Sequence, residues 1–178
     1  AILWLRRDLR LDDNPALHRA IASGQPLVPL NNHVPDEEQP WEPGGASRWW
    51  LHGSLASLDA ALRQAGSRLR IERGDSLSVL RRVIAETEAT EVHWSRLYDP
   101  TTRGRDTQIK QALRAEGLRC ESHNAALLFE PWDIKNGADQ PYRVFSAFWR
   151  ACVKSLRQIR PIPAPGVQLV TLTHVEDA

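Results

Sequence analysis

Short runs of apolar residues alternate along the chain with segments whose apolar positions recur every three or four residues. The apolar runs are typical of buried strands, and they occupy residues 2–5, 26–30, 68–72, 91–94 and 118–123. The segments between them predict helices, most clearly where Leu51, Leu55, Leu58 and Leu62 fall on one face of 47–65. Further helices are predicted from Pro15, after Asp75, from Pro100 to Glu116, and from about Arg143 to Leu156.

Residues at the predicted helix ends support these boundaries. Asn14-Pro15 and Asp99-Pro100 each place a residue that caps a helix N-terminus before a proline that suits the first helical position. Ser47 is expected to cap the helix of 47–65. Residues 31–46 contain three prolines and two glycines, and this polar stretch predicts a long loop.

Strands that alternate with helices predict a parallel sheet, because a chain that re-enters a sheet in the same direction needs a crossover connection. We therefore expect an α/β fold, a Rossmann-like three-layer sandwich with a five-stranded parallel sheet. Ligands of such sheets bind outside the carboxyl ends of the strands, where the strand order reverses. With the first strand central, the loops that begin at Arg6, Asn31 and Ser95 would line that crevice.

Composition excludes several classes of protein. The chain has 178 residues, of which 42% are hydrophobic and 25% are charged, as in an ordinary globular domain. Its formal net charge of +1 provides no overall field that attracts nucleic acid. No apolar run is long enough for a membrane span and no signal peptide is recognisable, so we expect no membrane association and a cytoplasmic location. Cys120 and Cys152 are expected to be reduced core thiols.

Common catalytic and nucleotide-binding motifs are absent from the sequence. There is no GxGxxG after the first strand, no GxxxxGK[ST] and no GxSxG, and the histidines show no HExxH or other metal-binding spacing. His93 is interpreted as a core or sheet-edge residue. For Trp49 and Trp50 we expect one indole in the core and the other at a surface, with stacking on a planar ligand as the alternative.

Five segments, in order from residue 2 to about 153, together resemble the DNA photolyase and cryptochrome family. They are WLRRDLRLDDNPAL, GASRWWLHGSLASLDAAL, RLRIERGD, VHWSRLYDPTTRGRD and PYRVFSAFWRAC. The segments ASRWW and LLFEPWDIKNG are most similar to a bacterial branch related to plant cryptochromes and to cyclobutane pyrimidine dimer photolyases that carry a folate antenna.

The resemblance implies an organisation in two domains. Residues 1–155 would be the α/β domain that holds a light-harvesting antenna chromophore, and 156–178 would begin the interdomain linker. The helical domain that holds FAD and binds damaged DNA would lie outside this chain, which would have no repair activity by itself. The implied function is the antenna-binding domain of a deoxyribodipyrimidine photolyase. The alternatives are the same domain of a blue-light sensor, or a stand-alone nucleotide-binding module.

The resemblance also suggests residues for the antenna, which would be methenyltetrahydrofolate in the first place, or 8-hydroxydeazaflavin or a flavin. Arg48 and Asp99 align with family residues that contact an antenna, although Asp99 is also a good N-cap. Thr101 and Thr102 replace a family Asn-Glu pair that binds the pterin, so a folate would be held differently, with Trp41 or Trp50 stacking on it. The remaining candidates lie in the predicted loop after the second strand, namely Asn31, Asn32 and His33.

Two segments are predicted to face the helical FAD domain. The stretch RRDLRLDD could be a phosphate cradle, a DNA-contact loop or a salt-bridged seam; it lacks the glycines of a P-loop, and its charges nearly cancel. We interpret it as a polar seam in which Arg6, Arg7 and Arg10 pair with the aspartates of the same stretch and with that domain. Tyr142 and Phe148 belong to the second segment, whose exposed apolar surface would favour self-association of this chain.

Overall fold

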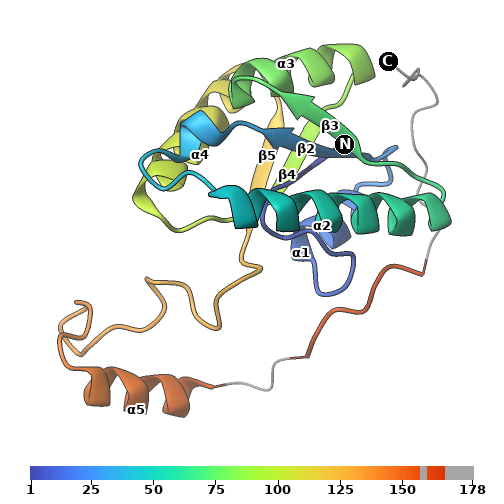
Figure 1. Ribbon diagram of the computed structural model, residues 1–178. Helices are drawn as coiled ribbons and strands as arrows, with labels where there is room; N and C mark the ends of the chain where they lie inside the picture. Colours follow the sequence, from blue (N-terminus) through green and yellow to red (C-terminus); the bar gives the residue numbers. More distant parts are fainter. Residues whose placement is uncertain (157–159, 167–178) are drawn as a thin grey trace.

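The computed structural model describes residues 1–156 and 160–166, and its centre is a five-stranded sheet in the order β3-β2-β1-β4-β5 (Figure 1). All four strand pairs are parallel. The strands are β1 (Ile2–Leu5), β2 (Val28–His33), β3 (Arg70–Arg73), β4 (Glu91–Ser95) and β5 (Arg119–His123). The predicted α/β fold with a central first strand is thereby confirmed.

Helices cover both faces of this sheet. The helices are α1 (Pro15–Ala22), α2 (Gly45–Gln64), α3 (Ser76–Thr87), α4 (Pro100–Ala115) and α5 (Phe145–Ser155), with a short 3₁₀ helix η1 (Pro35–Glu38). Leu3 and Leu5 of β1 pack with α1 and α2, whereas Ile2 and Trp4 pack with α3 and α4. Successive side chains of a strand point to opposite faces, so β1 contributes to both cores of the three-layer sandwich.

Three helices have side-chain N-caps, and these include the predicted caps Asn14 and Asp99. The side chains of Asn14, Asp75 and Asp99 accept hydrogen bonds from backbone N–H groups in the first turns of α1, α3 and α4, at 3.0, 2.8 and 3.0 Å. Each bond satisfies one backbone donor that the helix itself leaves unpaired. These caps place the starts of α3 and α4 at the carboxyl ends of β3 and β4.

Two boundaries near the second strand were predicted wrongly. Asn31, Asn32 and His33 belong to β2, because their backbone pairs with β3 regardless of their polar side chains. The helix expected to be capped by Ser47 begins at Gly45 instead. Trp49 and Trp50 are 76% and 71% exposed, so neither indole is in the core; the buried side chains of α2 are Leu58 and Leu62, further along the helix.

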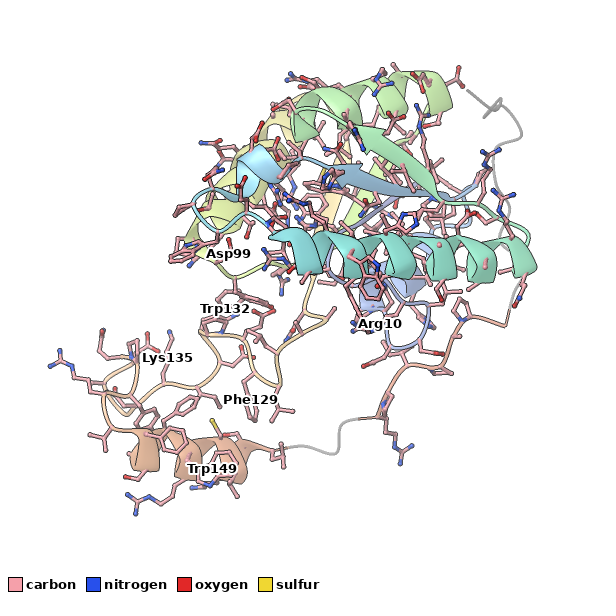
Figure 2. All side chains as sticks on the ribbon, in the orientation of Figure 1. Arg10, Asp99, Phe129, Trp132, Lys135 and Trp149 are labelled. Atoms are coloured by element: carbon pink, nitrogen blue, oxygen red, sulfur yellow. The ribbon has the colours of Figure 1, made fainter. Side chains whose placement is uncertain are left out.

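The helix α5 stands apart from the sandwich, at the end of the loop that follows β5 (Figure 1). Trp149 lies on this helix, far from Arg10 at the edge of the sandwich (Figure 2). Its exposed apolar side chains include Phe145, Phe148 and Trp149, and the Tyr142 ring packs edge-on against Phe148 at 6.4 Å. Cys152 is buried on α5 and Cys120 is buried in the sheet, and both are free thiols as predicted.

The described part of the C-terminal segment returns to the sandwich. Asp13 and Ile162 exchange two hydrogen bonds, one between backbone groups at 2.7 Å and one from the Ile162 N–H to the Asp13 carboxylate at 3.2 Å. The Asp12 carboxylate accepts the Ala164 N–H at 3.0 Å. Part of the predicted linker, 157–159 and 167–178, lies outside the described residues. Within the described residues, no helix combines the length and apolar character of a membrane span.

Candidate functional site

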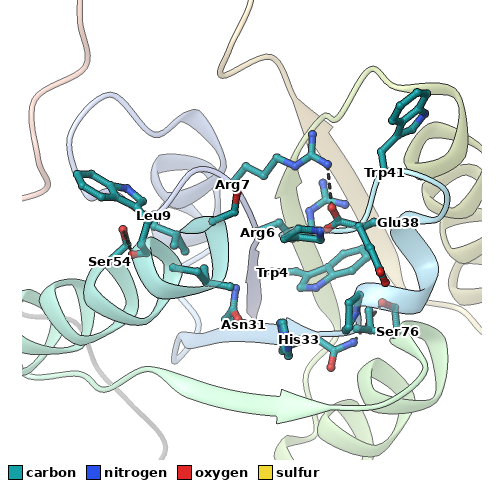
Figure 3. A pocket seen from close by; sticks show the side chains of 18 of the residues that line it. Trp4, Arg6, Arg7, Leu9, Asn31, His33, Glu38, Trp41, Ser54 and Ser76 are labelled. Atoms are coloured by element: carbon teal, nitrogen blue, oxygen red, sulfur yellow. Dashed lines mark hydrogen bonds and ion pairs between the residues drawn. The ribbon is translucent and has the colours of Figure 1, made fainter. Parts of the chain in front are cut away.

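A cavity of about 670 Å³ opens at the carboxyl ends of β1 and β2, between η1 and the first turns of α2 (Figure 3). Of the three loops expected to line the crevice, those that begin at Arg6 and Asn31 contribute to this cavity, whereas the loop that begins at Ser95 does not. Of the predicted antenna residues, five line the cavity, namely Asn31, Asn32, His33, Trp41 and Trp50. The three arginines of the opening segment also line it.

Trp4 contributes to the cavity from the central strand. The indole is 1% exposed and meets Trp94 edge-on, with ring centroids 5.8 Å apart. The guanidinium groups of Arg6 and Arg105 lie 4.3 and 5.3 Å from its ring centroid, within the range of cation–π attraction. Sequence reasoning missed both Trp4 and Arg105 as cavity residues, although the position of Trp4 near the end of the central strand was a usable signal.

Arg6 is a buried cation whose guanidinium is held by two groups. Its Nη1 pairs with Asp106 at 2.6 Å, where both side chains are largely buried (7% and 11% exposed), and its Nη2 donates to the Ser95 carbonyl. Burial lowers the pKa of the Arg6 guanidinium, and the charge of Asp106 opposes that shift. The predicted pairing within the opening segment was wrong here, because the Asp8 carboxylate instead accepts the Arg6 backbone N–H at 3.0 Å and the Ser95 hydroxyl at 2.6 Å.

Arg7 and Arg10 also have partners other than those predicted. Arg7 pairs with Glu38 of η1 at 2.9 Å and with Asp99 at 3.5 Å, and its side chain is 53% exposed. Arg10 donates to backbone carbonyls, those of Asp12, Asp13 and Ala125, at 3.1, 2.9 and 2.8 Å. The carboxylates of Asp12 and Asp13 hold the C-terminal segment instead. Arg7 and Arg10 therefore connect the loop after β1 to other loops at the edge of the cavity.

The two asparagines of β2 fix the cavity wall. The Asn31 amide donates to the Leu5 carbonyl at 3.0 Å, which extends the pairing of β1 and β2. The Asn32 amide donates to the Gly74 carbonyl at 2.9 Å and lies 3.1 Å from the Ser76 hydroxyl. Glu37 of η1 also accepts from Ser76, so β2, η1 and the start of α3 form one hydrogen-bonded rim.

Three predicted antenna residues lie outside this cavity. Arg48 is exposed on the first turn of α2 and is not among the residues that line the cavity. Asp99 and Thr102 are the N-cap pair of α4: burial would raise the pKa of Asp99, but the hydrogen bonds from Thr102 and the charge of Arg7 bring it below its usual value. The cap thus occupies one Asp99 oxygen, and Arg7 the other.

Buried polar atoms without a hydrogen-bond partner occur in three residues of this cavity. They are Trp4 Nε1, Arg6 Nε and Asn32 Oδ1. Two are donors and one is an acceptor, and leaving such groups unpaired in a protein interior costs about 1–3 kcal/mol each. The cavity therefore suits a ligand that carries acceptors as well as a donor.

A second polar cluster lies on the other half of the sheet, where His93 and Glu91 of β4 meet His123 and Glu121 of β5. The Nδ1 of His93 is 3.5 Å from the Nε2 of His123, and its Nε2 is 3.0 Å from Glu91. His93 is 1% exposed, which agrees with its interpretation as a buried sheet residue.

Acidification is expected to destabilise the fold through His123. Burial, together with the neighbouring His93, lowers the pKa of His123 to about 4; Arg96 and Arg19 act in the same direction, and Glu121 opposes them. An unfolded histidine has a pKa of about 6.5, so below that pH the unfolded state binds a proton that the folded state does not. The free energy of unfolding should therefore fall by about 1–3 kcal/mol as the pH drops from about 6.5 to about 4.

Urea unfolding of the metal-free protein at several pH values measures this effect. His123→Gln should flatten the pH dependence in that window, whereas His52→Gln, at an exposed position of α2, serves as the matched control. Identical pH dependence of His123→Gln and the unmodified chain would show that His123 titrates normally.

Comparisons with known proteins agree on one family. A model described as DNA photolyase matches residues 1–166. Cryptochrome-1 of Arabidopsis thaliana is 43% identical over 154 residues, covering 86% of this chain and 22% of the relative. The deoxyribodipyrimidine photo-lyase of Agrobacterium fabrum is 43% identical over 164 residues, covering 92% of this chain and 34% of the relative. The chain thus spans about a third or less of the length of these relatives.

Solved structures give the same result. A bacterial class III photolyase from Agrobacterium tumefaciens superimposes with a TM-score of 0.89 and 41% identity, over 97% of this chain and 35% of that one. An archaeal photolyase from Sulfolobus tokodaii, solved with two FAD molecules, superimposes with a TM-score of 0.79 and 25% identity, over 93% and 37% of the two chains.

Proposed function

Because the chain belongs to the DNA photolyase family and matches its N-terminal α/β domain, we propose that the cavity at the carboxyl ends of β1 and β2 binds a light-absorbing antenna chromophore. The observation that carries this proposal is the lining of the cavity, which includes the exposed indoles of Trp41 and Trp50 and three residues with buried, unpartnered polar atoms. The volume of about 670 Å³ lies in the usual range for sites of organic ligands. When bound, the chromophore supplies the absorption of light.

Methenyltetrahydrofolate is the proposed antenna, with 8-hydroxydeazaflavin and a flavin as the alternatives. All three have a flat ring system with donors and acceptors along its edge, which suits stacking on Trp41 or Trp50 and hydrogen bonding to the amides of β2. Methenyltetrahydrofolate also carries carboxylates on its glutamate part, which can replace Glu38 or Asp99 as partners of the half-exposed Arg7 guanidinium. The antenna roles of Arg48, Asp99 and Thr102 remain predictions.

The proposed setting is a photolyase that repairs pyrimidine dimers in DNA, with FAD and the DNA-binding surface in a helical domain outside this chain. A blue-light sensor is the second candidate, because a cryptochrome and a photolyase are equally similar to this chain, each at 43% identity. A stand-alone nucleotide-binding module has less support, since the sequence lacks the glycine-rich phosphate loops of such modules.

We further propose that the helical domain packs against α5 and the rim arginines. Tyr142 and Phe148 form an aromatic contact beside other exposed apolar side chains of α5. Arg7 is half exposed and can reach a neighbouring domain, whereas Arg6 is buried and would act by positioning the rim. The boundary at residue 155 coincides with the end of α5 at Ser155. Self-association and a cytoplasmic location remain predictions.

Binding of methenyltetrahydrofolate to the purified chain tests the antenna proposal. We expect saturable binding, measured by the shift of the folate absorption band, and a three- to tenfold weaker affinity for Trp50→Ala, since aromatic stacking is worth about 0.5–1.5 kcal/mol. Trp49→Ala is the matched control, because this neighbouring indole is equally exposed but does not line the cavity. Failure of the folate, the deazaflavin and the flavin to bind, or equal losses in both variants, would contradict the proposal.

A further inference from the structure

The cluster of histidines and carboxylates on β4 and β5 lies away from the proposed antenna cavity. Parallel pairing places His93 opposite Glu121 and Ser95 opposite His123. Side chains two residues apart on a strand point to the same face, so His93, Glu121 and His123 all face the layer that contains α1. No spacing motif reveals this group, because its members come from two strands.

The ligand atoms of these three residues have the separations that a metal ion requires. One nitrogen of each histidine and one Glu121 carboxylate oxygen all lie within 4.8 Å of one another. His93 Nδ1 and His123 Nε2 lie 3.5 Å apart, which is long for a hydrogen bond. Two histidine nitrogens bound to one tetrahedral zinc ion at 2.0–2.1 Å lie about 3.3–3.4 Å apart. The separation of these two nitrogens is therefore within a few tenths of an ångström of the value expected for a shared ion.

Glu91 orients His93 for this role. Its carboxylate oxygen lies 3.0 Å from His93 Nε2 and 2.5 Å from a nitrogen of Arg119. An ionised carboxylate only accepts hydrogen bonds, so Nε2 carries the hydrogen and Nδ1 presents its lone pair to His123. A carboxylate on the outer nitrogen is the usual support of a metal-binding histidine.

The charges around the cluster leave Glu121 available. Arg19 of α1 and Arg119 lie 3.6 and 4.0 Å from its two oxygens, which is longer than a close ion pair. Arg96, the other cation near His123, is engaged by Glu130. A divalent cation would replace the long contacts of Glu121 with Arg19 and Arg119 by a direct bond to the Glu121 carboxylate.

We propose that His93, His123 and Glu121 form a binding site for a divalent transition metal of the zinc class. Two imidazoles and one carboxylate are the donors that zinc accepts in sites that keep a fourth position open. His123 and Glu121 are partly exposed on the edge strand β5, so an ion can enter from solvent and retain a water molecule. The ion would join β5 to β4 by side-chain bonds in addition to the backbone pairing.

Titration of the untagged, chelator-treated chain with Co²⁺ and Zn²⁺ tests the proposal. We expect one Co²⁺ per chain with the visible absorption band of a four-coordinate site, displacement of that band by Zn²⁺, and a higher unfolding temperature with Zn²⁺. Absence of the band together with absence of saturable Zn²⁺ binding by calorimetry would overturn the proposal.

Variants assign the site to its residues. His123→Gln and Glu121→Gln change partly exposed side chains, and each should weaken Zn²⁺ binding at least tenfold, while circular dichroism verifies the fold. Glu91→Gln should weaken it ten- to a hundredfold without removing a ligand. His52→Gln, on α2, is the control and should bind as the unmodified chain does. Unchanged Zn²⁺ affinity of both His123→Gln and Glu121→Gln would overturn the assignment.

Discussion

Replacing Asp106 with asparagine is expected to lower the free energy of unfolding by about 3–5 kcal/mol. The substitution removes the carboxylate that pairs with Arg6 at 2.6 Å. The Arg6 guanidinium then stays buried with the Ser95 carbonyl as an acceptor but without an ion-pair partner. Arg105, 2.9 Å from the other Asp106 oxygen, loses the same partner. Urea unfolding of the variant and the unmodified chain measures the difference.

Two comparisons show whether burial is the cause. Arg7→Met removes an ion pair of similar length, but its side chain is 53% exposed, so the cost should stay below about 1 kcal/mol. The double variant Arg6→Met with Asp106→Leu should recover part of the lost stability, because it removes both charges of the buried pair, while Arg105 keeps Glu37 as a partner. A cost for Asp106→Asn no larger than that for Arg7→Met would refute this account of the rim.

Trp4→Ala should also destabilise the protein by about 3–5 kcal/mol, because it removes a large indole from a packed interior. Trp4 is 1% exposed and belongs to the same core cluster as Val28 and Trp94. Its loss would also open the floor of the cavity between the two arginines that lie over the ring. Thermal and urea unfolding measure the first effect, and folate titration measures the second.

Trp4→Phe separates stability from binding. Phenylalanine retains most of the packing but lacks the Nε1–H that has no partner in the structure, so this variant should keep more of the stability than Trp4→Ala and bind the antenna more weakly. Trp49→Ala, at a position 76% exposed, should change the free energy of unfolding by no more than about 0.5 kcal/mol. Equal destabilisation by Trp4→Ala and Trp49→Ala would contradict the role of Trp4 as a core residue.

The sequence was sufficient for most of the architecture. Strand periodicity, helix periodicity and capping pairs such as Asn14-Pro15 are local signals, so they identified the five parallel strands and their order of connection. The error at β2 has a clear origin: Asn31 to His33 lack an apolar pattern, yet their backbone groups find partners on β3. Strand length there depends on a neighbouring strand about 40 residues away in sequence, as Asn31 pairs with Ile71.

Which residues meet in the sites depended more on the tertiary structure than on local sequence. The predicted topology placed a crevice at the carboxyl ends of the strands, and the family resemblance suggested Trp41 and Trp50, which do line the cavity. Local sequence could not select Asp106 as the partner of Arg6, because the two are 100 positions apart and three aspartates lie in the opening segment itself.

By itself, the sequence determined the alternation of strands and helices, the edge of the sheet where a ligand would bind, and the family. Those properties follow from backbone geometry, side-chain periodicity and motifs within short stretches. Only the tertiary structure decided which charges pair and where α5 lies, apart from the sandwich. It also brought His93 Nδ1 on β4 to within 3.5 Å of His123 Nε2 on β5. Such contacts join distant segments, and the packing of the whole chain sets the distance between them.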